Sequence, residues 1–237
     1  MPLILAVDTS AKPVSCALVE NNKVLGCFYS NTGLTHSQTL MPMIDALLKV
    51  SDISIDRLDA VAVNAGPGSF TGVRIGVSAV KGIAFTYNTP CISVSTLEAM
   101  AEAVACSSDS IICGVMDARC QQVYSALFQR DEQGQLVRLT ADEAISIDAL
   151  REQLKTYDSN IVLVGDGSEL CYRTLSDDIS RLSLAPSSVR YQSASATAVV
   201  AHRKFEAGET VDAESLLPVY LRLPQAEREL NSRLNNK

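Results

Sequence analysis

Two glycine-rich turns are the segments of this sequence best suited to binding a ligand. The first reads GPGSFTG from Gly66 to Gly72 and lies between an apolar run and a predicted helix. Backbone N–H groups at a helix N-terminus attract anions, so this turn could hold a phosphate. It could equally be a tight turn in which Ser69 or Thr71 caps the helix. A second turn, at Gly165–Ser168, repeats the G-x-G-S pattern.

Neither turn matches a catalytic signature. No lysine follows the last glycine, as a P-loop requires, and Pro67 stands where the nucleophile motif G-x-S-x-G needs its first glycine. The chain has two histidines, and the position one helical turn after His36 is Leu40. We therefore predict no metal site and no peptidase activity. We expect His36 and His202 to be capping or surface residues.

A carboxylate follows the first apolar run of each half of the chain. Asp8-Thr9-Ser10 ends the first run, and Asp117 ends the run that starts at Ile111. At the carboxyl end of a strand, a carboxylate can hold Mg²⁺ through water while hydroxyls contact phosphate. It can also accept hydrogen bonds from the amides of its own turn. The residues alone leave both interpretations open.

Composition limits the classes of partner. The net charge of -7 disfavours direct binding to nucleic acid, which depends on Lys and Arg. Seven cysteines, odd in number and without C-x-x-C spacing, favour buried thiols in a reducing compartment. The N-terminus lacks the basic region of a signal peptide, and no apolar run approaches the ~20 residues of a membrane span. We expect a soluble, cytoplasmic protein.

The predicted elements recur in the same order in both halves. We expect strands at 3–7, 14–20, 23–30, 59–65, 91–94, 111–116, 123–129, 136–139 and 161–164. Helices are expected at 36–50, 71–87, 96–105, 147–156 and 193–206, with one more ending at Leu175. A shift of 109 residues aligns the two runs that end in aspartate, and a shift of 99 aligns the two glycine turns. This agreement indicates a duplicated βββαβα lobe.

A duplicated lobe of this kind is the plan of the actin/Hsp70/hexokinase-like (ASKHA) fold, an α/β architecture of two lobes, each with a mixed β-sheet flanked by helices. We assign residues 1–106 to the N-terminal lobe and 107–237 to the C-terminal lobe, with a polar tail from Gln225. In this fold a nucleotide lies between the lobes, against two hairpins tipped by aspartate. Kinases of the fold usually have glycine two residues after each aspartate. Here Ser10 and Arg119 occupy those positions, which argues against an efficient phosphotransferase.

The helix predicted at 71–87 has an unusually bare face. Gly72, Gly76, Ala79 and Ile83 share that face, and each glycine inside a helix costs about 1 kcal/mol relative to alanine. Close approach of another backbone would offset this cost. That backbone could belong to a neighbouring element of the same chain or to a partner protein.

The sequence resembles the TsaB (YeaZ) family. The resemblance rests on ILAVDTS, HSQTLMP, GPGSFTGVRIG, KGIA, SVSTLEAMA, the Asp117–Arg119 segment with Gln122–Tyr124, and PVYLR near the end. It implies a role in forming N6-threonylcarbamoyladenosine at position 37 (t6A37) of tRNAs that read codons beginning with A. Proteins of this family have no established catalysis of their own. They pair with TsaD, a paralogue that transfers the threonylcarbamoyl group, and TsaE, a small ATPase, joins the pair.

The resemblance also implies where a partner binds. The dimer contact of the family uses the first two helices of the N-terminal lobe, here 36–50 and 71–87, so it favours a partner surface for the bare face. The H-x-x-x-H metal motif of TsaD is present only as its first histidine. Related chains often read DARRGQVY where this chain has Cys120 and Gln121 in DARCQQVY. Only Asp117, Arg119 and Tyr124 are therefore carried over.

We expect a non-catalytic scaffold that activates TsaD, supports TsaE binding and forms a homodimer when alone. It would need no cofactor, would contact tRNA only through the complex and would not bind membranes. Weak binding of an adenine nucleotide stays open. The alternative is a small-molecule kinase or ATPase of the same fold. The expected partner surface comprises His36, Leu40, Met43, Leu47, Gly72, Arg74, Ile75, Gly76, Ala79 and Ile83. The expected remnants of phosphate-binding loops are Asp8, Thr9, Ser10, Gly66, Gly68, Ser69, Asp117, Gly165 and Gly167.

Overall fold

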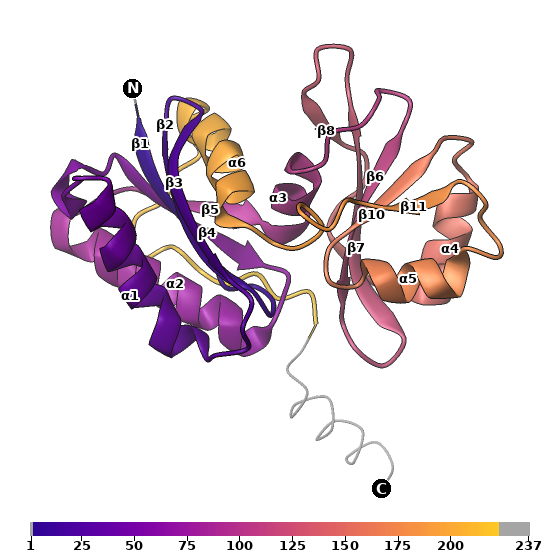
Figure 1. Cartoon of the computed structure of the whole chain (residues 1–237), viewed down its shortest axis with the longest axis horizontal. Coiled ribbons are helices and arrows are strands. Elements are labelled where there is room, and N and C mark those ends of the chain that lie inside the picture. The colour runs from indigo at the N-terminus through magenta and orange to yellow at the C-terminus, as the bar shows by residue number, and fades with distance from the viewer. Residues whose placement is uncertain (1, 223–237) are drawn as a thin grey trace, which may run out of the picture.

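The structure, a computed structural model, describes residues 2–222 as two lobes that lie side by side (Figure 1). The predicted polar tail, Gln225–Lys237, lies outside the described residues. Each lobe is built on one mixed β-sheet, and helices cover its faces. No described helix has both the length and the apolar character needed to cross a membrane.

The first sheet has the strand order β3-β2-β1-β4-β5. β1, β2 and β3 form an antiparallel meander, whereas β4 and β5 run parallel to β1. Asn21 and Asn22 turn the β2–β3 hairpin with positive φ angles of 49° and 62°. The strands are β1 (Leu3–Asp8), β2 (Val14–Glu20), β3 (Lys23–Ser30), β4 (Ala60–Gly66) and β5 (Cys91–Ser95).

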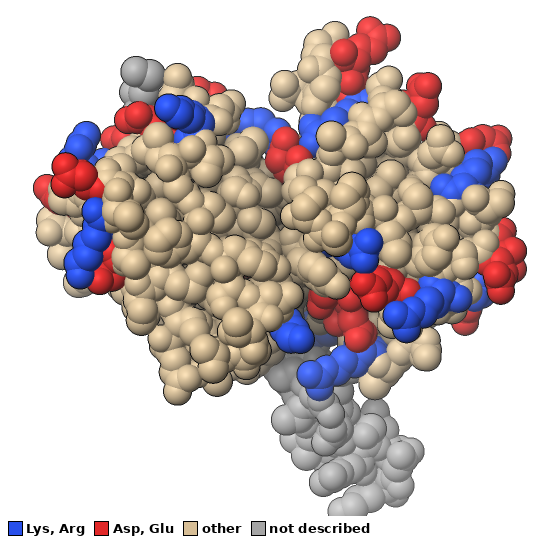
Figure 2. Space-filling view, viewed as in Figure 1, with Lys and Arg blue, Asp and Glu red and all other residues tan. Residues whose placement is uncertain are grey.

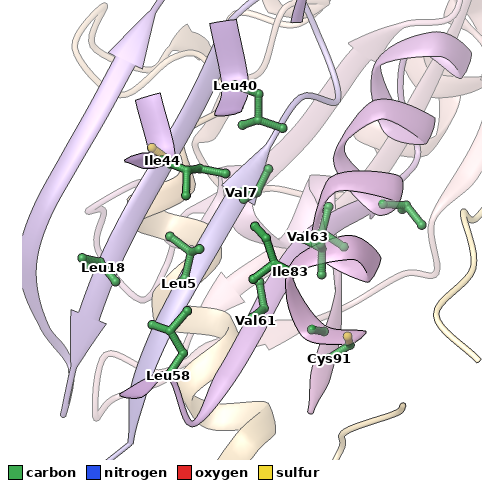
Figure 3. Packing of buried hydrophobic residues seen from close by; sticks show 14 of the residues in the cluster. Leu5, Val7, Leu18, Leu40, Ile44, Leu58, Val61, Val63, Ile83 and Cys91 are labelled. Carbon is green, nitrogen blue, oxygen red and sulfur yellow. The ribbon is translucent and has the colours of Figure 1, made fainter. Parts of the chain in front are cut away.

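The central strands of this sheet are buried on both faces, which explains their continuous apolar runs. Successive side chains alternate between the faces. Leu5 and Val7 pack towards α1 (His36–Val50) and α2 (Phe70–Tyr87), as Figure 3 shows for this core cluster. Ile4 and Ala6 point the opposite way, towards α6 (Ala194–Glu206).

The second sheet repeats the first. Its order is β8-β7-β6-β10-β11, and β9 also pairs with β7. The strands are β6 (Ile111–Asp117), β7 (Gln122–Arg130), β8 (Leu136–Arg138), β9 (Glu143–Ser146), β10 (Ile161–Val164) and β11 (Leu182–Leu184). α4 (Ile147–Lys155) and α5 (Ser168–Leu175) cover one face. The short strands β9 and β11 and the 3-10 turn Ile55–Arg57 are additions to the predicted elements.

The glycine turns confirm the duplication in detail. Gly66 and Gly165 end β4 and β10 with φ angles of 133° and 113°, a region that side chains rarely adopt. In both lobes the second glycine packs on the backbone of the aspartate hairpin. A Cβ on Gly68 would overlap the carbonyl oxygen of Ser10, and one on Gly167 would lie 2.9 Å from the amide nitrogen of Asp117. The chain therefore has the duplicated fold predicted from its sequence.

Two helices cover the sheet of the lobe to which they do not belong in sequence. α3 (Thr96–Glu102) packs with Leu97 and Met100 on the second sheet, whereas α6 packs with Ala198 and Ala201 on the first. Figure 1 shows α6 beside β1 and β2. The division expected at residues 106 and 107 follows the sequence, whereas in space α6 and the residues after it pack with the first lobe. The sequence predicted this helix but not which sheet it covers.

Residues 211–222, which we call the C-terminal strap, also return to the first lobe. Val211 pairs with Cys91 at the edge of β5, and the amide of Val219 donates to the carbonyl of Ala65 at 2.7 Å. Between these points, Lys81 Nζ of α2 donates to the carbonyl of Glu214 at 3.0 Å. The strap ends at the second lobe, where the Arg222 guanidinium donates to the carbonyl of Ala118.

Candidate functional site: the cleft between the lobes and the groove between α1 and α2

A cleft of about 740 Å³ separates the two lobes at the carboxyl ends of their central strands. Segments from both lobes that were predicted to contact a ligand line this cleft. The first lobe contributes Ser10 and the Gly68–Thr71 turn, and the second lobe contributes Asp117 and Arg119. Tyr124 and Asp166 also line it, and the strap supplies the third wall from Val219 to Arg222. The structure therefore brings together segments that are distant in the sequence.

Asp8 does not face this cleft as a free carboxylate. Its side chain is buried, and Oδ1 accepts hydrogen bonds from the Ser10 amide and hydroxyl at 2.8 and 2.7 Å. Oδ2 accepts from Asn64 Nδ2 at 2.6 Å. Burial raises the pKa of the Asp8 carboxyl, and these hydrogen bonds only partly oppose the rise. Of the two interpretations left open by the sequence, the geometry favours the carboxylate that caps its own turn.

The polar groups beside Asp8 are also used internally. The Thr9 hydroxyl donates to the carbonyl of Gly72 at 2.7 Å, and the Ser10 carbonyl accepts from the Ser69 amide at 2.6 Å. Of the two capping candidates in the sequence, Ser69 caps α2, because its hydroxyl accepts from the Gly72 amide at 3.3 Å. These hydrogen bonds hold the first glycine turn against the β1–β2 hairpin. They also use the Thr9 hydroxyl and the Ser69 amide, two donors that could otherwise bind a phosphate.

The second lobe presents two carboxylates to the cleft. Asp117 Oδ1 accepts from the Arg119 amide at 2.7 Å, in a turn where Arg119, Cys120 and Gln121 all have positive φ angles. Asp166 is open to the cleft. The surrounding protein still raises its pKa to about 6 by desolvation, and the negative charges of Asp117 and Asp8 add to the rise. Asp166 is not among the site residues expected from the sequence, although it lies inside the second glycine turn.

The strap closes the cleft with a stack that the sequence analysis missed. The rings of Phe70 and Tyr220 lie 4.7 Å apart, and the Arg74 guanidinium sits 3.8 Å from the centre of the Phe70 ring. Arg74 Nε donates to the Tyr220 hydroxyl at 2.8 Å. The only sequence signal for this contact was the PVYLR segment, whose distance from Phe70 in sequence concealed it.

A second hollow, which we call the α1–α2 groove, has a volume of about 520 Å³. Its lining is mainly apolar or small and includes Met41 of α1 together with Ile75, Ser78 and Ala79 of α2. Phe70, Thr71 and Arg74 line its mouth, and the first two also line the cleft. In Figure 2 the visible surface over α1 and α2 has few charged side chains except at its outer edge, whereas charges gather where the lobes meet.

The structure divides the predicted partner surface into accessible and inaccessible residues. His36, Arg74, Ile75 and Ala79 line the groove and are exposed or half-buried. Met43 lies in a different hollow, between β3 and α1. The remaining residues are buried in the core of this chain, although Leu40 also lines the groove, and their contact with a partner stays a prediction. These are Leu40, Leu47, Gly72, Gly76 and Ile83.

The small size of Gly72 and Gly76 has an internal cause. A Cβ on either residue would overlap Thr9, which is fully buried beneath α2. The exposed face of α2 is instead formed by Thr71, Ser78, Gly82 and Phe85, and a Cβ on Gly82 would meet nothing within 4 Å. The Phe85 side chain at the end of this face is 82% exposed.

The two histidines differ in their surroundings. His36 begins α1, and its Nε2 lies 3.3 Å from the carbonyl oxygen of Lys12. His202 is only 3% exposed, so its predicted surface position is wrong; it lies on the face of α6 that packs inward. Within residues 2–222, no group of three or more His, Cys, Asp or Glu side chains could hold a metal ion.

Comparison with known proteins gives consistent relatives over almost the whole chain. The family model for TsaD, the tRNA N6-adenosine threonylcarbamoyltransferase, matches residues 30–230. The tRNA threonylcarbamoyladenosine biosynthesis protein TsaB of Bacillus subtilis is 31% identical over 94% of this chain and 96% of its own length. The protein of the same name from Escherichia coli is 33% identical over 92% of this chain and 94% of its own length.

Solved structures agree with these relatives. YeaZ from Pseudomonas aeruginosa superposes with a TM-score of 0.74 at 28% identity, covering 93% of this chain and all of that chain. An uncharacterized protein with similarity to peptidase YeaZ, from the same organism, superposes with a TM-score of 0.77 at 27% identity. It covers 94% of this chain and all of that chain. The ROK hexokinase of Thermus thermophilus superposes at 0.50 with 12% identity, covering 87% of this chain and all of that chain, which supports the fold alone.

Proposed function

Because the chain belongs to the TsaB family, we propose that it takes part in forming threonylcarbamoyladenosine at position 37 of tRNA as a non-catalytic subunit. It pairs with the TsaD transferase, activates it and supports the binding of TsaE, all in the cytoplasm. It needs no cofactor, and tRNA reaches it only through the complex. When the transferase is absent, it forms a homodimer. The relatives named for this pathway match nearly the entire chain, which supports the pathway.

The observation that carries the non-catalytic role is the inward bonding of the first hairpin. An efficient phosphotransferase needs a carboxylate that can reach a metal ion and amides that can reach a phosphate. Here the buried Asp8 accepts three hydrogen bonds from Ser10 and Asn64, and the Ser69 amide donates to the Ser10 carbonyl. The first hairpin therefore holds the glycine turn of its own lobe, and the proposed role of the chain is carried by its surface.

The partner surface that we propose is the α1–α2 groove with its continuation along α2. It offers apolar contact area at Met41, which is 47% exposed, and at Phe85. Small residues at Ser78 and Gly82 leave room for a helix of the partner to approach closely. Exposed apolar groups flanking such a surface are typical of protein–protein interfaces.

The test is binding to the TsaD protein of the same organism, followed by tRNA modification with purified components. Ser78→Arg and Met41→Glu place charge in the groove at accessible positions, so both variants should fold but lose pairing and activation. Val137→Glu is the matched control, because Val137 is 44% exposed and lies on β8 of the second lobe. Full pairing by both groove variants would refute the surface. Unchanged t6A formation without the chain would refute the function.

The cleft keeps the kinase or ATPase alternative testable. Its volume of about 740 Å³ leaves room for weak binding of an adenine nucleotide. Calorimetry of the isolated chain with Mg-ATP, followed by a product assay, separates the two functions. We expect weak binding at most and no turnover, whereas micromolar binding with turnover would favour the enzyme.

A further inference from the structure

α3 and α6 contact each other where the two lobes adjoin, with α3 between α6 and the second sheet (Figure 1). α3 is fixed to the second sheet by the apolar side chains of Leu97 and Met100. α6 is fixed to the first sheet by Ala198 and Ala201. The apolar contact of α3 with the cluster around α6 is made by the small side chain of Ala99. Apolar packing therefore holds each helix to a sheet more firmly than it holds the two helices to each other.

An arginine of α6 connects the two helices. Arg203 Nη1 lies 2.7 Å from Glu102 Oε2 of α3, and Arg203 Nη2 lies 4.0 Å from Glu98 Oε1. The Glu102 side chain is only 13% exposed, so solvent ions screen its pair with Arg203 less than they screen a pair on the open surface. The Arg203–Glu102 pair is thus an electrostatic link from the first lobe to the second.

The second lobe orients both acids through their other carboxylate oxygens. Arg130 Nη1 of β7 lies 3.6 Å from Glu102 Oε1, and Arg138 Nη2 of β8 lies 3.2 Å from Glu98 Oε2. Arg130 Nη2 also donates to the backbone carbonyl of Glu102 at 2.7 Å. Charges joined in such a network contribute more than isolated surface pairs. Because the acids are already oriented, little side-chain entropy is lost when Arg203 binds them.

Without this link, few connections would oppose rotation of one lobe against the other. The chain passes between the lobes at Ser95–Thr96, where β5 leads into α3, and at residues 185–193, which lead from β11 to α6. The strap adds the hydrogen bond from Arg222 to the Ala118 carbonyl. Rotation about a few such segments is the usual way in which a cleft between two lobes changes its width. A fixed contact between α3 and α6 prevents that rotation.

We propose that the Arg203–Glu102 pair fixes the angle between the two lobes, so that the cleft keeps one width. This goes beyond the proposed function, because it concerns motion within the chain and depends on neither the transferase nor tRNA. Arg203 acts here as a positioning residue, since it lies outside the walls of the cleft. Loss of the pair leaves the two chain connections and the Arg222 hydrogen bond, and the lobes then adopt a range of angles.

The cysteines of the chain provide the labelling sites for a test. Cys27 on β3 of the first lobe and Cys120 in the β6–β7 turn of the second lobe are both exposed. Four of the other cysteines are buried, and Cys106→Ser removes the partly exposed fifth. Spin labels on Cys27 and Cys120 then report the distance between the lobes by pulsed electron paramagnetic resonance. An excess of unlabelled chain suppresses distances between copies. We expect one narrow distance distribution.

Arg203→Gln keeps most of the side chain but removes its charge, and we expect it to replace the narrow distribution with a broad one. Lys204→Gln is the matched control, because Lys204 is the next residue of α6 and pairs with Glu209, 2.6 Å away, which does not belong to the second lobe. It should leave the distribution narrow. Glu102→Gln should broaden the distribution as Arg203→Gln does. The double variant should broaden it no further, because both substitutions remove the same contact.

Three results would overturn the proposal. A broad distribution in the natural chain means that the angle between the lobes is not fixed. A distribution as narrow in Arg203→Gln as in Lys204→Gln means that the pair does not fix it. Broadening that adds up in the double variant means that the two residues act separately. Circular dichroism checks that each variant keeps its helices. If Arg203→Gln loses helical signal, Glu102→Gln decides alone, because it leaves α6 unchanged and keeps the backbone carbonyl that Arg130 binds.

Discussion

Two glycines of α2, Gly76 and Gly82, differ in how crowded their surroundings are. Substituting each by alanine tests why the helix contains glycine at these positions. A Cβ on Gly76 would overlap Thr9 Oγ1 and lie 3.2 Å from Val63 Cγ2. Thr9 is fully buried and its hydroxyl is bonded to Gly72, so it has little room to move. A Cβ on Gly82 would meet nothing within 4 Å. Gly76→Ala and Gly82→Ala make the same chemical change in one helix with different consequences.

The magnitudes follow from three effects. Alanine in place of glycine stabilises a helix interior by about 1 kcal/mol, so Gly82→Ala should raise the free energy of unfolding by that amount. Gly76→Ala has the same gain, but overpacking costs about 1–3 kcal/mol. Displacing the Thr9 hydroxyl also weakens a buried hydrogen bond worth about 1 kcal/mol. Gly76→Ala should therefore lower the free energy of unfolding by about 1–3 kcal/mol.

Urea denaturation followed by circular dichroism measures both variants against the natural chain. The expected order of stability is Gly82→Ala, then the natural chain, then Gly76→Ala. If Gly76→Ala is as stable as Gly82→Ala, Thr9 does not explain the small residue at position 76. In that case the earlier interpretation, in which the whole face is bare for a partner, would regain support.

Three further predictions concern the cleft and the Asp117 hairpin beside it. Gln121 is exposed and has a φ angle of 57°, a conformation that is unfavourable for a residue with a side chain. Gln121→Gly removes this strain and should raise the free energy of unfolding by about 0.5–1 kcal/mol. A lower free energy of unfolding would show that the Gln121 side chain makes a stabilising contact. The raised pKa of Asp166 means that the fold favours its protonated form, so stability is lost as pH rises from 3.8 through about 6. Asp166→Asn should therefore melt at higher temperature than the natural chain above pH 6, and the gap should close below pH 3.8; a constant gap would contradict the shift. Tyr220→Phe keeps the stack on Phe70 but removes the hydroxyl that accepts from Arg74, so urea denaturation should show a loss of no more than about 1 kcal/mol. A loss of several kcal/mol would mean that the hydroxyl anchors the whole strap.

Local structure was predictable wherever the residues of one short segment determine its conformation. The apolar run of β1 indicated a strand buried on both faces, and Gly66 and Gly165 indicated turns because few other residues adopt their φ angles. The strands β9 and β11 were missed because each is short and half-exposed, and they exist through pairing with neighbours. Pairing partners are not encoded in the periodicity of the strand itself.

Contacts between distant segments were less predictable. The bare face at Gly72 and Gly76 was visible in the sequence, but Thr9, which accounts for it, is separated from them by most of the first lobe. His202 was expected at the surface because nothing in its neighbours marks the inward face of α6. Likewise Tyr220 meets Phe70 only after the strap has crossed the lobe. Such contacts depend on tertiary packing, which overrides local patterns.

The exchange of α3 and α6 between the lobes has a consequence for the origin of the molecule. A single lobe, cut from its repeat, would keep a sheet with one uncovered apolar face, since the helix that covers it comes from the other half. A half-length chain would therefore cover that face by taking the helix from a second copy. Present-day halves, produced separately, should likewise be found as complementing fragments rather than as independent domains.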